Sequence, residues 1–191
     1  MATWLDIIGS IIIGTLVIFL IMKLNYQVST NSTEITSNGI VQSNLTTIST
    51  VMENDLYKIG YRISGDKLNI ASVNQFSYNA DVDNNGILDS VRYYLGSTSQ
   101  AKFGTNLNDK PLFKVLNGGK TAIIIGIVRD CQFTYYDSTG TQILDSKLKT
   151  PAQRRQVRVV KVYIKCESPY KINNYYQTAE YSRKIKPVNL K

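Results

Sequence analysis

The sequence predicts an α+β protein in which a long amino-terminal helix packs on an antiparallel β-sheet head. The helix is apolar in its first half and amphipathic in its second half. An uncharged apolar run opens the chain, and apolar residues then recur every three or four positions up to residue 59. Several β-branched or alternating stretches follow. Because these stretches show no strand–helix–strand repeat, we expect an antiparallel sheet.

The first segment, residues 1–25, is predicted to be a membrane or filament-core helix. Residues 7–22 carry no charge, and only Asp6 interrupts the apolar segment, residues 4–22. This length is at the lower end of what spans a bilayer. A signal peptide would need a basic stretch before the run and small residues at a cleavage site. The sequence around Lys23 offers no such site, so we expect the segment to be retained.

The second segment, residues 26–62, is predicted to continue this helix. Its apolar residues are spaced by three or four positions, which places them on one helical face. Between Gln27 and Asn38 the chain is rich in Ser, Thr and Asn, so a break or two separate helices is the alternative. Gly60 and Gly65 mark the end of this predicted helix. The predicted face consists of Val41, Leu45, Ile48, Met52, Leu56 and Ile59.

Residues 63–191 are predicted to form the β head. Alternation and β-branched or aromatic content indicate the strands. They are expected at roughly 68–80, 87–95, 121–136 and 156–166, with a late strand at 175–182.

The positions of Cys131 and Cys166 bear on how the predicted strands pair. The sequence midpoint between them falls in a polar stretch just before Pro151, where a turn is expected. A hairpin centred there would bring the two cysteines opposite each other. Both would lie on core faces, with a disulfide expected if the head is exported. Two buried thiols that pack as small hydrophobes are the alternative. The predicted core faces are Ile123, Ile125, Ile127, Phe133 and Tyr135 with Cys131, and Val160, Val162 and Ile164 with Cys166.

The acidic turn, residues 81–89, resembles a calcium-binding loop in its spacing. Oxygen-bearing side chains stand at positions 1, 3, 5 and 9, glycine stands at 6, and the carbonyl of Ile87 is available at 7. Position 12 is Arg92 rather than Glu, so the loop is not an EF-hand. A simple hairpin turn at Asn85-Gly86 is the alternative, and both can hold together. The candidate ligands are Asp81, Asp83, Asn85, Ile87 and Asp89, and calcium is the one cofactor suggested.

Charge and composition bear on partners and on catalysis. Residues 147–191 hold 12 Lys or Arg and 2 Glu, a net charge of +10, against −2 for residues 1–146. This basic region could contact DNA, an anionic surface or a neighbouring subunit, although a solvated basic face is the alternative. The chain has no histidine, which removes the commonest general base. We therefore expect no enzymatic activity and no small-molecule substrate.

The order and spacing of several motifs resemble the type IV pilin and type II secretion pseudopilin superfamily, most closely its larger minor-pilin-like members. The likeness runs almost from end to end. It includes the two-part helix with its exit at 52–61, the acidic-turn hairpin at 81–95, the strands at 133–140 and 157–164, and the closing residues 187–190. The family's basic leader is not found before the apolar run, and Asp6 takes the place of the family's acidic residue only if Ala2 is the first mature residue. We therefore expect an atypical amino terminus.

This resemblance implies a structural subunit of an extracellular filament, anchored in the inner membrane before assembly. Its helices would pack together as a homo-oligomer, and its heads would form the surface. A single-span membrane protein with a calcium-binding or adhesive head that never polymerises, and a secretion pseudopilin, are the alternatives. A hydrolase that uses the turn carboxylates is least favoured, because clustered carboxylates suit a cation better. The residues implied in subunit packing are Trp4, Asp6, Ile7, Ile11, Leu16 and Phe19.

Overall fold

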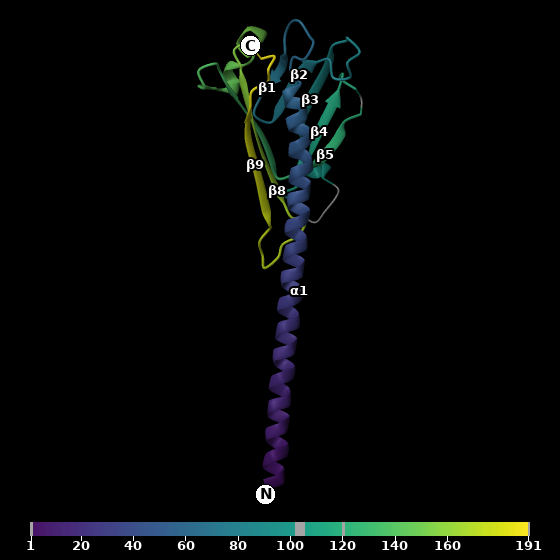
Figure 1. Ribbon diagram of the computed structural model, residues 1–191, viewed down its shortest axis with the longest axis vertical. Coiled ribbons are helices and arrows are strands. Elements are labelled where there is room, and N and C mark those ends of the chain that lie inside the picture. Colours follow the sequence, from purple (N-terminus) through teal and green to yellow (C-terminus); the bar gives the residue numbers. More distant parts are fainter. Residues whose placement is uncertain (1, 102–105, 120, 191) are drawn as a thin grey trace.

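A computed structural model describes residues 2–101, 106–119 and 121–190, and it confirms the α+β prediction. Helix α1 (Ala2–Tyr57) is one helix of 56 residues, and the β head is attached to its carboxyl-terminal half (Figure 1). The other half projects away from the head as an isolated helix. Residues 1 and 191, the outer ends of the predicted first and last segments, lie outside the described residues.

Helix α1 runs unbroken through the polar stretch where an interruption was considered. Threonine hydroxyls there bond back to the helix itself: Thr30 Oγ1 donates to Tyr26 O (3.0 Å) and Thr33 Oγ1 to Ser29 O (2.9 Å). Each hydroxyl shares a helical carbonyl, which has a second lone pair, so the backbone bonds of the helix are kept through this polar stretch. The helix ends at Tyr57, before the predicted limit of 62, because Gly60 (φ 70°) and Arg62 (φ 53°) adopt left-handed conformations.

The first sheet has five antiparallel strands in sequence order. The predicted strand 68–80 is two strands, because the chain turns at Ser72, whose N–H donates to Gln75 O (2.9 Å). The strand after residue 95 was not predicted, and its Pro111 weakened the strand signal. The strands are β1 (Leu68–Ala71), β2 (Gln75–Ala80), β3 (Asp89–Leu95), β4 (Lys110–Leu116) and β5 (Ile123–Val128).

The second sheet has four antiparallel strands in the order β7-β6-β8-β9. The predicted strand 121–136 divides at Arg129, so that its two halves belong to different sheets. The late strand begins three residues later than predicted, and β7 was not predicted. The strands are β6 (Asp130–Tyr136), β7 (Gln142–Ile143), β8 (Val159–Glu167) and β9 (Thr178–Ile185), and helix α2 (Pro151–Arg154) lies between β7 and β8.

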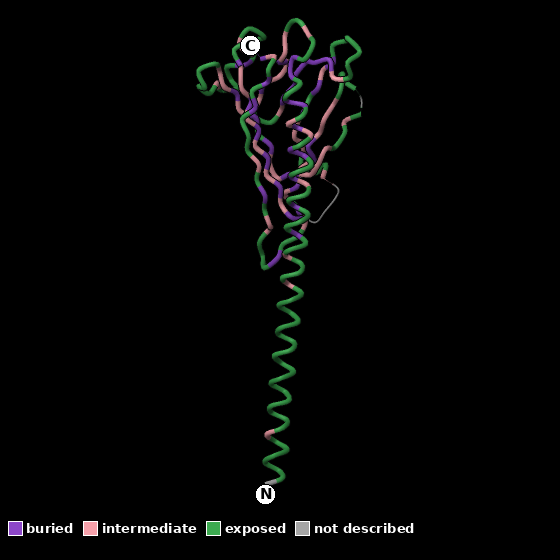
Figure 2. The backbone as a smooth tube through the Cα atoms, in the orientation of Figure 1, coloured by how far each residue is buried: buried purple, intermediate pink, exposed green. Residues whose placement is uncertain are grey.

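The core lies where α1 packs on β8, β9 and β5. Figure 2 shows buried residues along the upper part of α1 and exposed residues along nearly all of its lower part. The predicted helical face is confirmed, since all six of its residues are buried, and the predicted face of β8 is buried as well. The predicted face of 121–127 is only partly right: Ile125 packs partly buried against the core, whereas Ile123 lies on an edge strand and is 61% exposed.

Candidate functional site

The apolar segment is a long unpartnered surface of the described chain. Fourteen large apolar side chains between Trp4 and Met22 are each 49–72% exposed. Covering them would release on the order of 10–20 kcal/mol of hydrophobic free energy. By its length and composition α1 could cross a membrane. The residues implied in subunit packing are all exposed on this segment, namely Trp4, Asp6, Ile7, Ile11, Leu16 and Phe19.

The polar side chains within the apolar segment are largely satisfied by the helix itself. Ser10 Oγ donates to Asp6 O and Thr15 Oγ1 donates to Ile11 O, each at 2.8 Å. These hydroxyls therefore need no partner from water, which suits an apolar environment. Asp6 is the only ionisable side chain between Trp4 and Met22. It is the residue of this segment that calls for a polar or charged partner.

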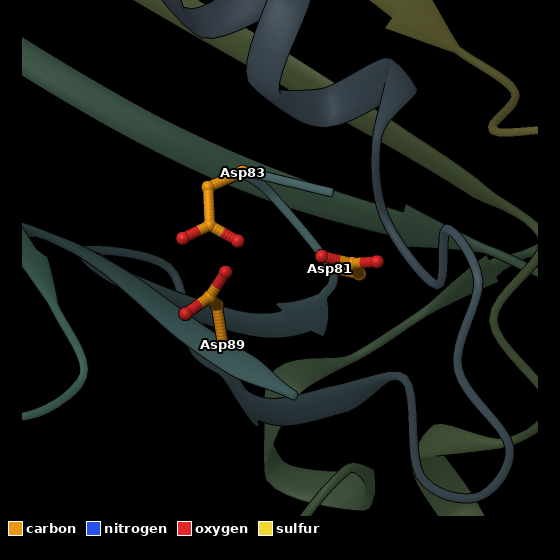
Figure 3. Close-up of side chains that lie close together, drawn as sticks. All are labelled: Asp81, Asp83 and Asp89. Carbon is orange, nitrogen blue, oxygen red and sulfur yellow. The ribbon is translucent and has the colours of Figure 1, made fainter. Parts of the chain in front are cut away.

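The acidic turn brings three carboxylates together, as the sequence predicted. One oxygen each from Asp81, Asp83 and Asp89 lies within 4.8 Å of the other two. Asp81 follows β2 and Asp89 begins β3, where the register pairs Ala80 with Asp89. Figure 3 shows the Asp83 and Asp89 carboxylates facing each other and Asp81 beside them. The hairpin turn and the carboxylate cluster are both present. Asn84 (φ 63°) and Gly86 (φ 83°) adopt left-handed conformations that reverse the direction of the chain.

Asp81 and Asp89 are buried at this turn, whereas Asp83 is exposed. Asp89 accepts hydrogen bonds from Asn117 Nδ2 (2.7 Å) and from Val82 N (2.9 Å), and these two bonds hold its pKa below the usual value. Asp81 Oδ2 accepts from Gly86 N (3.2 Å) and lies 3.7 Å from the guanidinium of Arg62. Arg62 therefore offsets part of the charge of Asp81.

The remaining predicted ligands are arranged differently. Asn85 Oδ1 accepts a hydrogen bond from Ile87 N (2.7 Å), and Asn85 Nδ2 donates to Asp83 Oδ2 (2.8 Å). The amide oxygen of Asn85 is thus already engaged within the turn. The side chain of Ile87 is 67% exposed, so any contribution of this residue to a cation would come from its carbonyl.

The two cysteines lie on the core side, but they are not directly opposite each other. Cys131 pairs with Ile164, and Cys166 lies two residues further along β8. A shift of two residues preserves the face of a strand, so the predicted face is right while the predicted pairing is wrong. Because β7 and α2 intervene, the connection is not a simple hairpin. Both cysteines are free, buried thiols, and burial raises the pKa of Cys166 to about 12.

Much of the basic region, residues 147–190 as described, takes part in holding the head together. Arg155 pairs with Asp66 (2.7 Å) and Arg183 with Glu53 (2.6 Å). Arg154 donates to the carbonyls of Leu68 (3.0 Å) and Lys149 (2.7 Å). A cavity of about 290 Å³ beside α2 is lined in part by Lys67, Arg154, Arg155 and Arg158.

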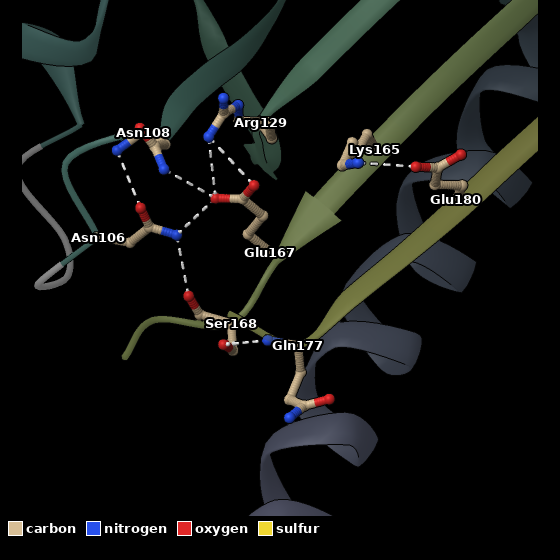
Figure 4. A network of polar contacts seen from close by, with 8 residues as sticks. All are labelled: Asn106, Asn108, Arg129, Lys165, Glu167, Ser168, Gln177 and Glu180. Atoms are coloured by element: carbon tan, nitrogen blue, oxygen red, sulfur yellow. Dashed lines mark hydrogen bonds and ion pairs between the residues drawn. The ribbon is translucent and has the colours of Figure 1, made fainter. Parts of the chain in front are cut away.

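A polar network that the sequence did not predict connects the start of β4 to the end of β8 (Figure 4). Glu167 accepts from Arg129 Nη1 (3.1 Å), Asn106 Nδ2 (3.2 Å) and Asn108 Nδ2 (3.1 Å). Nearby, burial and the charge of Glu167 raise the pKa of Asp109 to about 6. Isolated Asn and Asp residues in a loop carry no periodic signal, so only the spatial proximity reveals this network.

Comparison with protein-family models, with curated proteins and with solved structures found no match for this chain. The exposed apolar segment and the acidic turn are therefore the two features from which a function can be inferred. The first offers a large surface for lipid or for other helices. The second offers clustered oxygen ligands.

Proposed function

We propose that this protein is a structural subunit of an extracellular, type IV pilus-like filament, which polymerises through its amino-terminal helix. The observation that carries the proposal is the projection of the apolar segment away from the head, uncovered by any described residue. Before assembly the segment would lie in the inner membrane. In the filament the helices of neighbouring subunits would cover it.

The distribution of apolar residues around the segment favours a bundle. A helix with one apolar stripe packs on one surface, whereas a helix that is apolar all round is surrounded on all sides. Consecutive residues such as Ile11, Ile12 and Ile13 are all exposed and face different directions around α1. The centre of a helical filament and a lipid bilayer both provide such surroundings, so one segment can serve both states.

Asp6 would then act at the junction between subunits. A carboxylate at the bilayer centre costs about 2.5–3.5 kcal/mol, which favours a site near the end of the helix or beside a cation. If Ala2 is the first mature residue, Asp6 is the fifth, and it could pair with the amino terminus of an adjacent chain. That pair would set the axial register of the helices as they assemble.

This role requires no catalytic chemistry. A hydrolase that used the acidic turn would need one carboxyl group with a raised pKa to act as the acid. The pKa of Asp89 is instead lowered by its hydrogen bonds to Asn117 and Val82. The turn therefore supports a cation-binding role better than general acid catalysis.

A single-span membrane protein that never polymerises is the second candidate, and a secretion pseudopilin is a third. The exposed apolar segment fits each of them, because each has a membrane-inserted state. They differ in whether the helices leave the membrane to form filaments. A pseudopilin would form only a short assembly and would be scarce at the cell surface.

The test is cryo-electron microscopy of material sheared from the native cells. We expect filaments that this sequence fits, with residues 4–22 in a central helical bundle. An Asp6→Ala variant should insert in the membrane but form few or no filaments. A Ser10→Ala variant is the matched control, because its hydroxyl bonds only to its own helix, and it should assemble normally. Protein found only in the membrane fraction, with no filaments, would contradict the proposal.

A further inference from the structure

We propose that the carboxylates of Asp81, Asp83 and Asp89 bind one calcium ion, and that this ion fastens the exit of α1 to two turns of the five-stranded sheet. The proposal concerns the head alone. It holds whether or not the protein polymerises.

The first observation is the crowding of like charges. Three carboxylate oxygens lie within 4.8 Å of one another, and two of the three residues are buried. Carboxylates at this distance repel each other, more strongly where water is excluded. Both oxygens of Asp89 accept hydrogen bonds, from Asn117 Nδ2 (2.7 Å) and from Val82 N (2.9 Å), which hold this carboxylate in place beside the other two. A divalent cation between the three groups would turn this repulsion into attraction.

The second observation is a buried oxygen with no partner. The side chain of Asp81 is completely buried, and its Oδ1 has no hydrogen-bond partner in the described part of the chain. Buried polar atoms in folded proteins nearly always have a partner, and the exceptions often mark a site for a bound water or ion. In Figure 3 one oxygen of Asp81 points toward the space beside Asp83 and Asp89. A cation there would satisfy that carboxylate.

The ligand chemistry favours calcium over other metals. Hard oxygen ligands suit calcium and magnesium, whereas zinc sites are built mainly from histidine nitrogen and cysteine sulfur, and residues 81–89 contain neither residue. Calcium accepts irregular sets of carboxylates, backbone carbonyls and waters, whereas magnesium demands near-ideal octahedral geometry. This turn offers such an irregular set of ligands, because it contains a glycine and because one of its three carboxylates, Asp83, is exposed to water.

The ion would connect segments that are distant in sequence. Asp81 N donates to Tyr61 O (3.0 Å), and Asp81 pairs with Arg62, so this ligand contacts the exit of α1. Asp89 accepts from Asn117 Nδ2 (2.7 Å), a residue of the turn between β4 and β5. Binding would therefore restrain the helix exit, the acidic turn and the β4–β5 turn together.

Calcium titration of the full chain in detergent micelles, after treatment with a chelator, tests this inference. We expect a dissociation constant on the order of 10⁻⁴–10⁻³ M, as in extracellular calcium modules, measured by titration calorimetry. At a free calcium concentration 100-fold above that constant, the thermal midpoint should rise by about 5–10 °C. Magnesium at the same concentration should produce a smaller rise.

Two variants identify the site. Asp83→Asn should abolish the rise, and because Asp83 is exposed and its bonds lie within the turn, this variant should fold without calcium. Asp137→Asn is the matched control, since Asp137 is an aspartate in the turn between β6 and β7 that, like Asp83, accepts hydrogen bonds from within its own turn. It should respond to calcium as the wild type does.

Three results would overturn the proposal. One is the absence of binding heat and of any midpoint change at a free calcium concentration 100-fold above the expected constant. Another is a full calcium response in Asp83→Asn. The third is an equal response to magnesium that persists in Asp83→Asn, because this would indicate charge screening rather than a site.

Discussion

Ile48 of α1 packs directly on Gly126 of β5. A Cβ atom added at Gly126 would lie only 2.3 Å from Ile48 Cδ1 and 2.4 Å from Ile48 Cγ1. Ile48 is fully buried, so it has little room to move away. The absence of a side chain at Gly126 thus allows α1 to approach the edge of the five-stranded sheet, while the same helix also packs on β8 and β9.

Gly126→Ala should therefore lower the free energy of unfolding by about 1–3 kcal/mol through overpacking. Thermal unfolding followed by circular dichroism of the full chain would measure the loss. In the double variant Ile48→Ala/Gly126→Ala, the methyl group added at position 126 would occupy the space left by the shorter side chain at position 48. The two changes should then cost less than the sum of the single variants. Strict additivity would show that the two residues do not contact each other.

Asp55 forms a buried polar centre between α1 and the first sheet. It pairs with Lys114 and accepts a hydrogen bond from Tyr93, and both residues lie within the sheet. Asp55→Ala would leave a largely buried ammonium and a buried hydroxyl unpaired. We expect a loss of about 2–4 kcal/mol in unfolding free energy, measured by denaturant titration.

Asp66→Ala is the comparison for that result. The ion pair of Asp66 with Arg155 is more exposed, with side-chain exposures of 35% and 67%. Its removal should cost less than about 1 kcal/mol. If Asp55→Ala lowered the free energy of unfolding by no more than Asp66→Ala, the polar centre would contribute little to the stability of the head.

Asp109 should make the head less stable as pH rises. Burial and the charge of Glu167 raise its pKa from 3.8 to about 6, so in this window the folded state binds more protons than the unfolded state. The stabilisation is complete below pH 3.8 and is lost as pH rises through 6. Asp109→Asn should therefore be more stable than the wild type above pH 6, by about 1–2 kcal/mol after allowance for solvent screening.

The free energy of unfolding, measured at several pH values, would show whether Asp109 lowers the stability as pH rises. Glu180→Gln provides the contrast, because a hydrogen bond from Lys165 lowers the pKa of Glu180. A lowered pKa stabilises the fold above the unfolded pKa, and that stabilisation is lost as pH falls through the folded pKa. Glu180→Gln should thus be less stable than the wild type at neutral pH. A loss of stability in Asp109→Asn at the same pH would contradict the assignment.

Cys131 and Cys166 should behave as buried thiols. Burial raises the pKa of both, so neither should react with a thiol reagent in the native chain at neutral pH. Denaturation without a reductant should release two reactive thiols per chain. Mass spectrometry after alkylation would count them. A count of zero would instead establish the disulfide expected for an exported head.

Sequence periodicity predicted the elements whose signal is local. The five positions from Val41 to Leu56 are buried because helical spacing places them on one side, and Ile59, just beyond the end of α1, is buried as well. The face of β8 with Val160 and Ile164 follows from strand alternation in the same way. The proximity of Asp81, Asp83 and Asp89 also follows from a short turn, in which nine residues bring their ends together.

Contacts between distant segments were decided only by the tertiary structure. The division of 121–136 between two sheets, the presence of β4 and the pairing of Cys131 with Ile164 each depend on which strands become neighbours. The contact of Ile48 with Gly126 and the pairing of Asp55 with Lys114 are of the same kind. The sequence alone determined the long helix, its two halves and the acidic turn, because these depend on residues a few positions apart. The sheet partners depend on closing long loops and on packing the whole core at once, which no local pattern records.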